Sequence, residues 1–116
     1  MKARERLYAK ENLTITKVVN VDDSLYEKIK YLSDNVYSAK ISDIINVAIE
    51  EYMEKAKPKF YVRSKTETVT YRNLHIRKNN ILLLKEYSKK TDISITKLIN
   101  SAIKEFVDSF DIKLEE

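Results

Sequence analysis

The chain has 116 residues, 43% of them hydrophobic and 34% charged, and carries a formal net charge of +4. This length suits one ordinary domain with a modest core, while the absence of cysteine and glycine excludes disulfides, thiolate chemistry and the glycine-rich loops of nucleotide-binding sites. No apolar run approaches the roughly 18 residues of a membrane span, and the N-terminus lacks the apolar centre of a secretory signal, so we expect an intracellular, cytoplasmic protein that does not enter a membrane.

Catalytic groups are sparse in this composition. The chain has one histidine, His75, which cannot build a metal site alone. Nothing in the spacing of the carboxylates places two of them in one cleft. We therefore expect no enzymatic activity, no cofactor and no small-molecule substrate.

Positive charge is concentrated in two segments. Residues 1–20 carry a net charge of +3 and residues 58–78 carry +5, whereas residues 21–57 carry −3 and residues 79–116 carry −1. The two positive segments hold all the arginines, namely Arg4, Arg6, Arg63, Arg72 and Arg77. Because these segments lie outside the expected helices, the pattern indicates contact with phosphate or nucleic acid.

The chain begins with a basic arm, residues 1–12, for which a frayed end, a short helix and a DNA-contacting arm all stay open. A first unit, residues 13–54, follows. It opens with Leu13–Val21, where the β-branched residues favour a strand with Val19 and Val21 on its inner face.

Two helices complete this first unit. The first spans about residues 23–34, with its N-cap supplied by the segment Asp22–Ser24 and with Glu27 as the capping-box partner of Ser24. The second is Ile41–Met53, and Lys40 stands at its cap position. The apolar residues at helical spacing are expected to be buried: Leu25, Ile29, Leu32, Ile41, Ile44, Ile45, Ala48, Ile49 and Tyr52.

A linker, residues 55–67, separates the first unit from the second. Pro58 ends the preceding helix. Phe60–Val62 has strong strand character, so an extra strand from the linker stays open.

The second unit, residues 68–108, repeats the order of strand, helix and helix, and an acidic tail, residues 109–116, follows it. Its strand, Thr68–Arg77, places Leu74 and Ile76 inward. The next elements are a helix over 78–90, which buries Ile81, Leu84 and Tyr87 and has Leu82 or Leu83 at its flank, and a helix over Ile95–Val107 with Ser94 as its N-cap.

The last helix of each unit is an internal repeat. Ile41–Met53 and Ile95–Val107 align without a gap and share six of thirteen residues, where chance would give roughly one. Asn46 and Asn100 are identical in the alignment and lie beside the apolar stripe, so a hydrogen bond across the helix interface and exposure to solvent both stay open.

Each unit resembles the ribbon-helix-helix DNA-binding family of the MetJ/Arc type. The resemblance rests on a short alternating strand, a capped helix and a second helix that carries an Asn-x-Ala-Ile pattern, and it covers about residues 14–53 and 69–107. Two units in one chain resemble the tandem regulators encoded by archaeal viruses. The resemblance implies a mainly α fold with a small β ribbon, in which two strand–helix–helix units form an intramolecular ribbon-helix-helix pseudo-dimer.

The resemblance also implies a DNA interface. The ribbon would enter the major groove and read bases with its outward residues, namely Thr16, Val18, Asn20, Tyr71, Asn73 and His75. The backbone N–H groups that begin the second helices would bind phosphate, at Lys40, Ile41 and Ser42 and at Ser94, Ile95 and Thr96. Basic residues on or beside the strands are expected to add phosphate contacts: Lys17, Arg72, Arg77 and Lys78.

The two units are expected to pair with each other, because about 40 residues is below the size that folds alone. The linker of roughly 14 residues spans about 45 Å when extended, enough to return along a helix about 20 Å long. Exchange of units between chains, and self-association along DNA, stay open.

A sequence-specific regulator of transcription that binds double-stranded DNA is therefore the leading interpretation. The alternative is an antitoxin or scaffold whose main partner is another protein. Antitoxins of this family usually add a long tail that wraps the toxin, and few residues follow the last helix here.

Overall fold

The computed structural model describes residues 13–55 and 60–110, and within them the chain forms two strands, four α-helices and a short π-helical segment. In chain order these are β1 (Thr14–Asp22), α1 (Asp23–Leu32), the π-helical segment η2 (Ser33–Tyr37), α2 (Ile41–Met53), β2 (Val69–Arg77), α3 (Lys78–Thr91) and α4 (Ile95–Asp108). In these ranges no helix has both the length and the apolar content needed to cross a membrane. The expected basic arm and the end of the acidic tail lie outside the described residues.

The two strands pair with each other in an antiparallel ribbon. Val18 lies opposite Asn73 at its centre, and the pairing runs from Thr14 opposite Arg77 to Asp22 opposite Val69. Backbone bonds of 2.9 Å continue the ladder one step beyond each end. The expected mainly helical fold with a small β ribbon is thus confirmed, and the described chain holds one strand pair rather than a sheet for each half.

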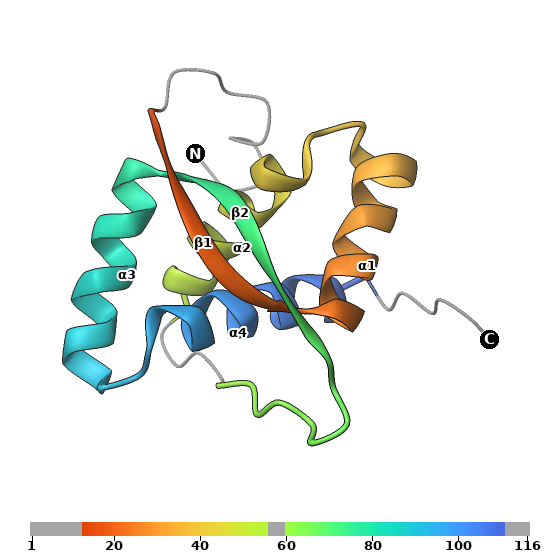
Figure 1. The fold of residues 1–116 in the computed structure, drawn as a ribbon. Coiled ribbons are helices and arrows are strands. Elements are labelled where there is room, and N and C mark those ends of the chain that lie inside the picture. Colours follow the sequence, from red (N-terminus) through yellow and green to blue (C-terminus); the bar gives the residue numbers. More distant parts are fainter. Residues whose placement is uncertain (1–12, 56–59, 111–116) are drawn as a thin grey trace.

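The ribbon lies across one face of a helical layer (Figure 1). Helices α2 and α4 pack against each other beneath it, while α1 and α3 flank them on opposite sides. The packing crosses the two halves of the chain, because α2 contacts β2 and α4 contacts β1. The halves therefore share one core.

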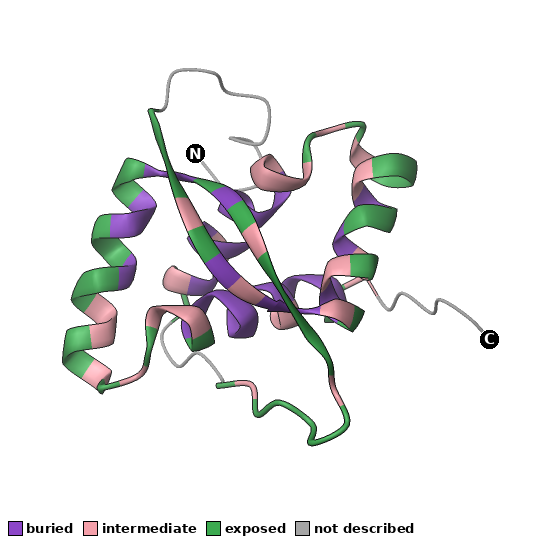
Figure 2. Ribbon diagram, in the orientation of Figure 1, coloured by how far each residue is buried: buried purple, intermediate pink, exposed green. Residues whose placement is uncertain are grey.

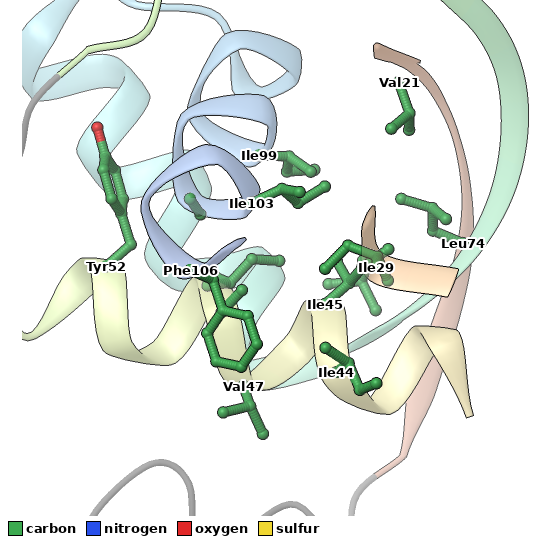
Figure 3. Packing of buried hydrophobic residues seen from close by; sticks show 14 of the residues in the cluster. Val21, Ile29, Ile44, Ile45, Val47, Tyr52, Leu74, Ile99, Ile103 and Phe106 are labelled. Carbon is green, nitrogen blue, oxygen red and sulfur yellow. The ribbon is translucent and has the colours of Figure 1, made fainter. Parts of the chain in front are cut away.

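That core forms where the apolar faces of the strands meet the apolar stripes of the helices. Figure 3 shows Ile45 of α2 and Ile99 and Ile103 of α4 beside Val21 and Leu74 of the ribbon. Full burial of one such side chain contributes about 1.5–3 kcal/mol, so this cluster supplies most of the drive to fold. The residues expected inside and found buried are Val19, Val21, Leu25, Ile29, Leu32, Ile44, Ile45, Ala48, Ile49, Tyr52, Leu74, Ile76, Ile81 and Leu84. Ile41 and Tyr87 are partly buried, whereas Leu82 and Leu83 are exposed.

The start of α1 differs from the expectation. The helix begins at Asp23, with no side-chain cap from Asp22, so the predicted capping box of Ser24 and Glu27 is wrong. A distant carboxylate serves instead: Glu67 accepts the N–H of Ser24 at 3.1 Å and its hydroxyl at 2.6 Å. The physical need is the same, because the first N–H groups of a helix have no partner within it.

The linker forms no strand between residues 60 and 68, so the extra strand considered for Phe60–Val62 is wrong. Its side chains instead reach the end of β1. The hydroxyl of Tyr61 donates to Oδ2 of Asp22 at 2.5 Å, and Nε of Arg63 donates to Oδ1 at 2.6 Å. Residues 56–59, with Pro58, lie outside the described part.

Candidate nucleic-acid interface

The six residues expected to read bases lie on the outer face of the ribbon and form three direct cross-strand pairs. These are Thr16 with His75, Val18 with Asn73, and Asn20 with Tyr71. Tyr71 is 73% exposed and Val18 57%, Thr16, Asn73 and His75 are exposed, and Asn20 is half-buried. Figure 2 shows the alternation of exposed and buried residues along both strands. The residues of outward parity therefore form one continuous face.

This face carries side chains that can form hydrogen bonds and apolar contacts with base edges in a DNA major groove. Oγ1 of Thr16 lies 3.1 Å from Nδ1 of His75, so these two side chains form a hydrogen-bonded unit at one end of the ribbon. The Asn73 amide offers both a donor and an acceptor, as adenine recognition requires, and the methyl groups of Val18 suit a thymine methyl. A two-stranded ribbon also has the width that the major groove of B-DNA admits.

Asn46 and Asn100 fix the ribbon on the helices. Asn46 Nδ2 donates to the carbonyl of His75 at 2.9 Å, and its Oδ1 accepts the N–H of Arg77 at 2.8 Å. Asn100 makes the same two bonds to β1, at 2.8 Å to the carbonyl of Asn20 and at 3.0 Å from the N–H of Asp22. Both residues are buried, so the alternative of exposure to solvent is wrong. A hydrogen bond across a helix interface is found for Asn46, whose Oδ1 accepts Nδ2 of Asn80 in α3 at 2.9 Å, whereas Asn100 bonds to β1 and to Thr96 of its own helix.

The starts of α2 and α4 lie close to the ribbon. Ser42 Oγ, in the first turn of α2, accepts the N–H of His75 at 3.3 Å. The N-cap Ser94 accepts the N–H of Lys97 at 3.1 Å, which confirms its predicted capping role. Lys40 is exposed and makes no side-chain cap bond. Helix starts of this kind attract anions through their N–H groups and the helix dipole.

The predicted phosphate residues at these helix starts are partly accessible. Ile41, Ser42, Ile95 and Thr96 are half-buried, and Ser94 is exposed. Beside the start of α4 lies a hollow of about 250 Å³, whose lining residues are Tyr61, Val62, Arg63, Ser94, Thr96, Lys97 and Asn100.

The structure corrects the expectation for Arg77. Its side chain is 4% exposed, and Nη1 donates to Oε2 of Glu50 at 2.9 Å inside the protein. Asn80 Nδ2 donates to the same carboxylate oxygen at 3.0 Å. A guanidinium that is buried and paired in this way is not available to a phosphate. The cause is the packing of α2 against β2, which covers Arg77 at the end of the strand.

Three other basic residues differ in their surroundings. The Arg72 guanidinium lies 3.6 Å from the centre of the Tyr26 ring and 3.6 Å from Oδ1 of Asp23. Its charge therefore already has partners within the protein. Lys17 is half-buried, and Lys78 is exposed at the first position of α3.

The contacts of several residues near the interface are not evident from the sequence. Glu50 stands in an apolar helix face, and the polar linker residues Tyr61 and Arg63 meet Asp22 only after folding. Burial, and then the bond to Asp22, raises the pKa of the Tyr61 hydroxyl well above its usual range. The one available hint was Glu50 one helical turn after Asn46, a charge placed where an apolar residue would fit the stripe.

Over residues 13–55 and 60–110 the structure shows no group of three or more histidine, cysteine, aspartate or glutamate side chains that could hold a metal ion. Comparison of the chain with models of known protein families, with curated proteins and with solved structures finds no match.

Proposed function

We propose that this protein is a sequence-specific regulator of transcription that binds double-stranded DNA and reads the major groove with the β1–β2 ribbon. The observation that carries the proposal is the pairing of Thr16 with His75, Val18 with Asn73 and Asn20 with Tyr71 on the outer face of the ribbon, where all of them but the half-buried Asn20 are exposed. Strand parity makes these residues the outward ones, and their direct pairing across the ribbon brings them within the width of one groove.

The ribbon-helix-helix arrangement is part of this proposal. Each strand leads directly into a helix and is followed by a second helix, and α2 and α4 carry the matching asparagines. In this interpretation the molecule is a pseudo-dimer within one chain, whose approximate twofold axis passes beside the central pair of Val18 and Asn73.

Phosphate contacts would come from both sides of the ribbon. The starts of α2 and α4 offer backbone N–H groups with Lys40 and Lys97 nearby, and Lys78 stands at the start of α3. These contacts set affinity and position the ribbon, whereas the paired side chains set specificity.

The two strands present different side chains at matching positions, so the recognised site is asymmetric at its centre. Asn73 would read adenine through its amide, and Val18 would meet a thymine methyl.

Selection of bound fragments from a random pool of double-stranded DNA tests the proposal. We expect enrichment of one short motif that is not a perfect palindrome. Recovery of unrelated sequences at every salt concentration, or no retention of DNA at low salt, would contradict it.

A surface on α3 favours a protein partner as the second candidate. Leu82 and Leu83 are exposed, at 56% and 42%, and lie beside Lys85, Glu86 and Lys89. Such leucines suit a scaffold or antitoxin contact, or a second copy on neighbouring DNA. Co-purification of a stoichiometric protein from the native source, lost in Leu82→Glu, would support the first of these roles.

A further inference from the structure

Asp22 and Arg77 occupy matching positions at the ends of the two strands. The N–H of Asp22 is held by Oδ1 of Asn100 in α4, and the N–H of Arg77 by Oδ1 of Asn46 in α2. Both junction residues are buried, at 0% and 3% exposure. The backbone environment is therefore the same, while the side chains carry opposite charges.

The helix residue one turn after each asparagine is also reversed in charge. Glu50 lies one turn after Asn46 and pairs with Arg77 at 2.9 Å. The residue one turn after Asn100 is Lys104, which pairs with Asp108 at 2.8 Å. Helix α2 thus presents a carboxylate to the strand end that it holds, whereas α4 carries an ammonium group at the matching place.

Asp22 obtains its positive partner from the linker, and this contact also needs α4. Arg63 Nε donates to Asp22 at 2.6 Å, and the adjoining backbone is anchored because the N–H of Tyr61 donates to Oγ of Ser101 at 2.9 Å. Ser101 follows Asn100 in α4. The residue that follows Asn46 in α2 is Val47, which offers no side-chain acceptor.

We propose that these reversed charges select the pairing partner: each half of the chain pairs with the unlike half, and pairing between like halves of two copies is disfavoured. In a β2–β2 pair from two copies, the buried Arg77 would face Lys104 instead of Glu50. In a β1–β1 pair, Asp22 would face Glu50, and the linker would lose Ser101. A buried charge that loses its counter-charge is strongly destabilising. The inference goes beyond DNA binding and does not depend on it.

An exchange of the two helix charges, Glu50→Lys with Lys104→Glu, tests this inference without changing the composition or the net charge. In this variant the carboxylate that would pair with Arg77 is at position 104 of α4. Within one chain α4 holds the end of β1, so it can place this carboxylate beside Arg77 only when it holds β2 of a second copy. We expect light scattering to change from monomer to dimer or larger species, with a Tm that rises with protein concentration. Glu50→Lys alone should lower the Tm and leave the protein monomeric.

A single introduced cysteine reports which strands pair, because the chain has none of its own. Val18 and Asn73 face each other at the centre of the ribbon, so in a β2–β2 pair position 73 would lie opposite itself. We expect Asn73→Cys to form disulfide-linked dimers at least tenfold more in the charge-exchanged chain than in the unexchanged one. Tyr71→Cys is the register control, because position 71 would then lie opposite position 75.

A second variant separates failure to fold from failure of the inference. Glu50→Lys with Arg77→Glu restores opposite charges within one chain, and it should be monomeric and recover most of the Tm lost in Glu50→Lys. The inference is overturned if this pair recovers nothing, or if the charge-exchanged chain is monomeric or unfolded while this pair folds. Equal crosslinking through position 73 in both backgrounds would also overturn it.

Discussion

Asn46 and Asn100 hold opposite ends of the ribbon with the same pair of hydrogen bonds, each to the strand of the other half of the chain. Asn46 binds the backbone of β2 at His75 and Arg77, and Asn100 binds β1 at Asn20 and Asp22. Because both side chains are buried, their removal leaves buried backbone groups of the ribbon without these partners. They therefore couple the position of the ribbon to the packing of α2 against α4.

We expect Asn46→Ala to lower the free energy of unfolding by about 1–3 kcal/mol, because it leaves buried backbone groups of β2 without partners. Urea denaturation measures the change. The matched control is Asn79→Ala, since Asn79 is exposed on α3. If both variants lost the same stability, the amide would not be holding the strand.

Asn73→Ala should change DNA recognition and leave stability within about 0.5 kcal/mol, because the side chain is exposed. Loss of a paired amide contact to adenine costs roughly 1–3 kcal/mol of discrimination at one base pair. Competition binding with sites that differ at each position measures it. An unchanged preference at every base pair would show that Asn73 does not read the sequence.

Lys78→Ala should weaken binding to all DNA sequences alike. Loss of one phosphate contact lowers the slope of log affinity against log salt by about one. Titrations at several salt concentrations give this slope. Lys89→Ala, at the far end of α3, is the control for loss of one positive charge, and an equal effect from both would argue against a local contact.

Arg77→Met should act on stability and leave the salt slope of DNA binding unchanged. This substitution leaves the buried carboxylate of Glu50 without the positive charge of Arg77. Breaking a buried ion pair in this way typically costs about 3–5 kcal/mol. The double replacement Arg77→Met with Glu50→Leu should recover much of this loss, because neither charge is then buried. Chemical denaturation compares the three chains, and a stable single variant would contradict the expected role of the pair.

Tyr52 makes stability depend on pH in the alkaline range. Burial raises the pKa of its hydroxyl from 10.0 to about 12, although a hydrogen bond with Ser101 acts in the opposite direction. Between pH 10 and 12 the unfolded tyrosine is ionised and the folded one is not, so this contribution to stability is present below pH 10 and is lost as the pH rises towards 12.

Tyr52→Phe should therefore lose less stability than the parent chain between pH 9 and 11, by roughly 1 kcal/mol or more. Urea denaturation at both pH values gives the difference. Tyr71→Phe is the control for loss of an exposed hydroxyl. Parallel loss of stability in the parent chain and in Tyr52→Phe would show that this group does not titrate as described.

Local pattern was enough to locate the strands and helices, because β-branched alternation and the helical spacing of isoleucine and leucine agree with what the core needs. The ends of β2 and α3 follow the expectation closely, and Ser94 caps α4 as its position implied. The outward residues of the ribbon could also be identified from the alternation of side chains along a strand, which depends only on the geometry of an extended chain.

What local pattern missed were contacts made between distant residues. Arg77 reads as an exposed cation at a strand end, but α2 covers that end and supplies Glu50. Phe60–Val62 reads as a strand, yet Tyr61 finds its partners in Asp22 and Ser101, each about 40 residues away. Such pairings depend on which helix lies beside which strand, and spacing along the chain carries no record of that.

The crossed packing of the two halves also constrains how the protein is synthesised. While the ribosome is still making the linker, β1 has no strand to pair with and α2 has no α4 to pack against. Only when Asn100 has emerged from the exit tunnel can the ribbon be held at both ends. We therefore expect folding to be late and cooperative, with slow closure of its long-range contacts, and a nascent first half that relies on its charged surface to stay free of other chains.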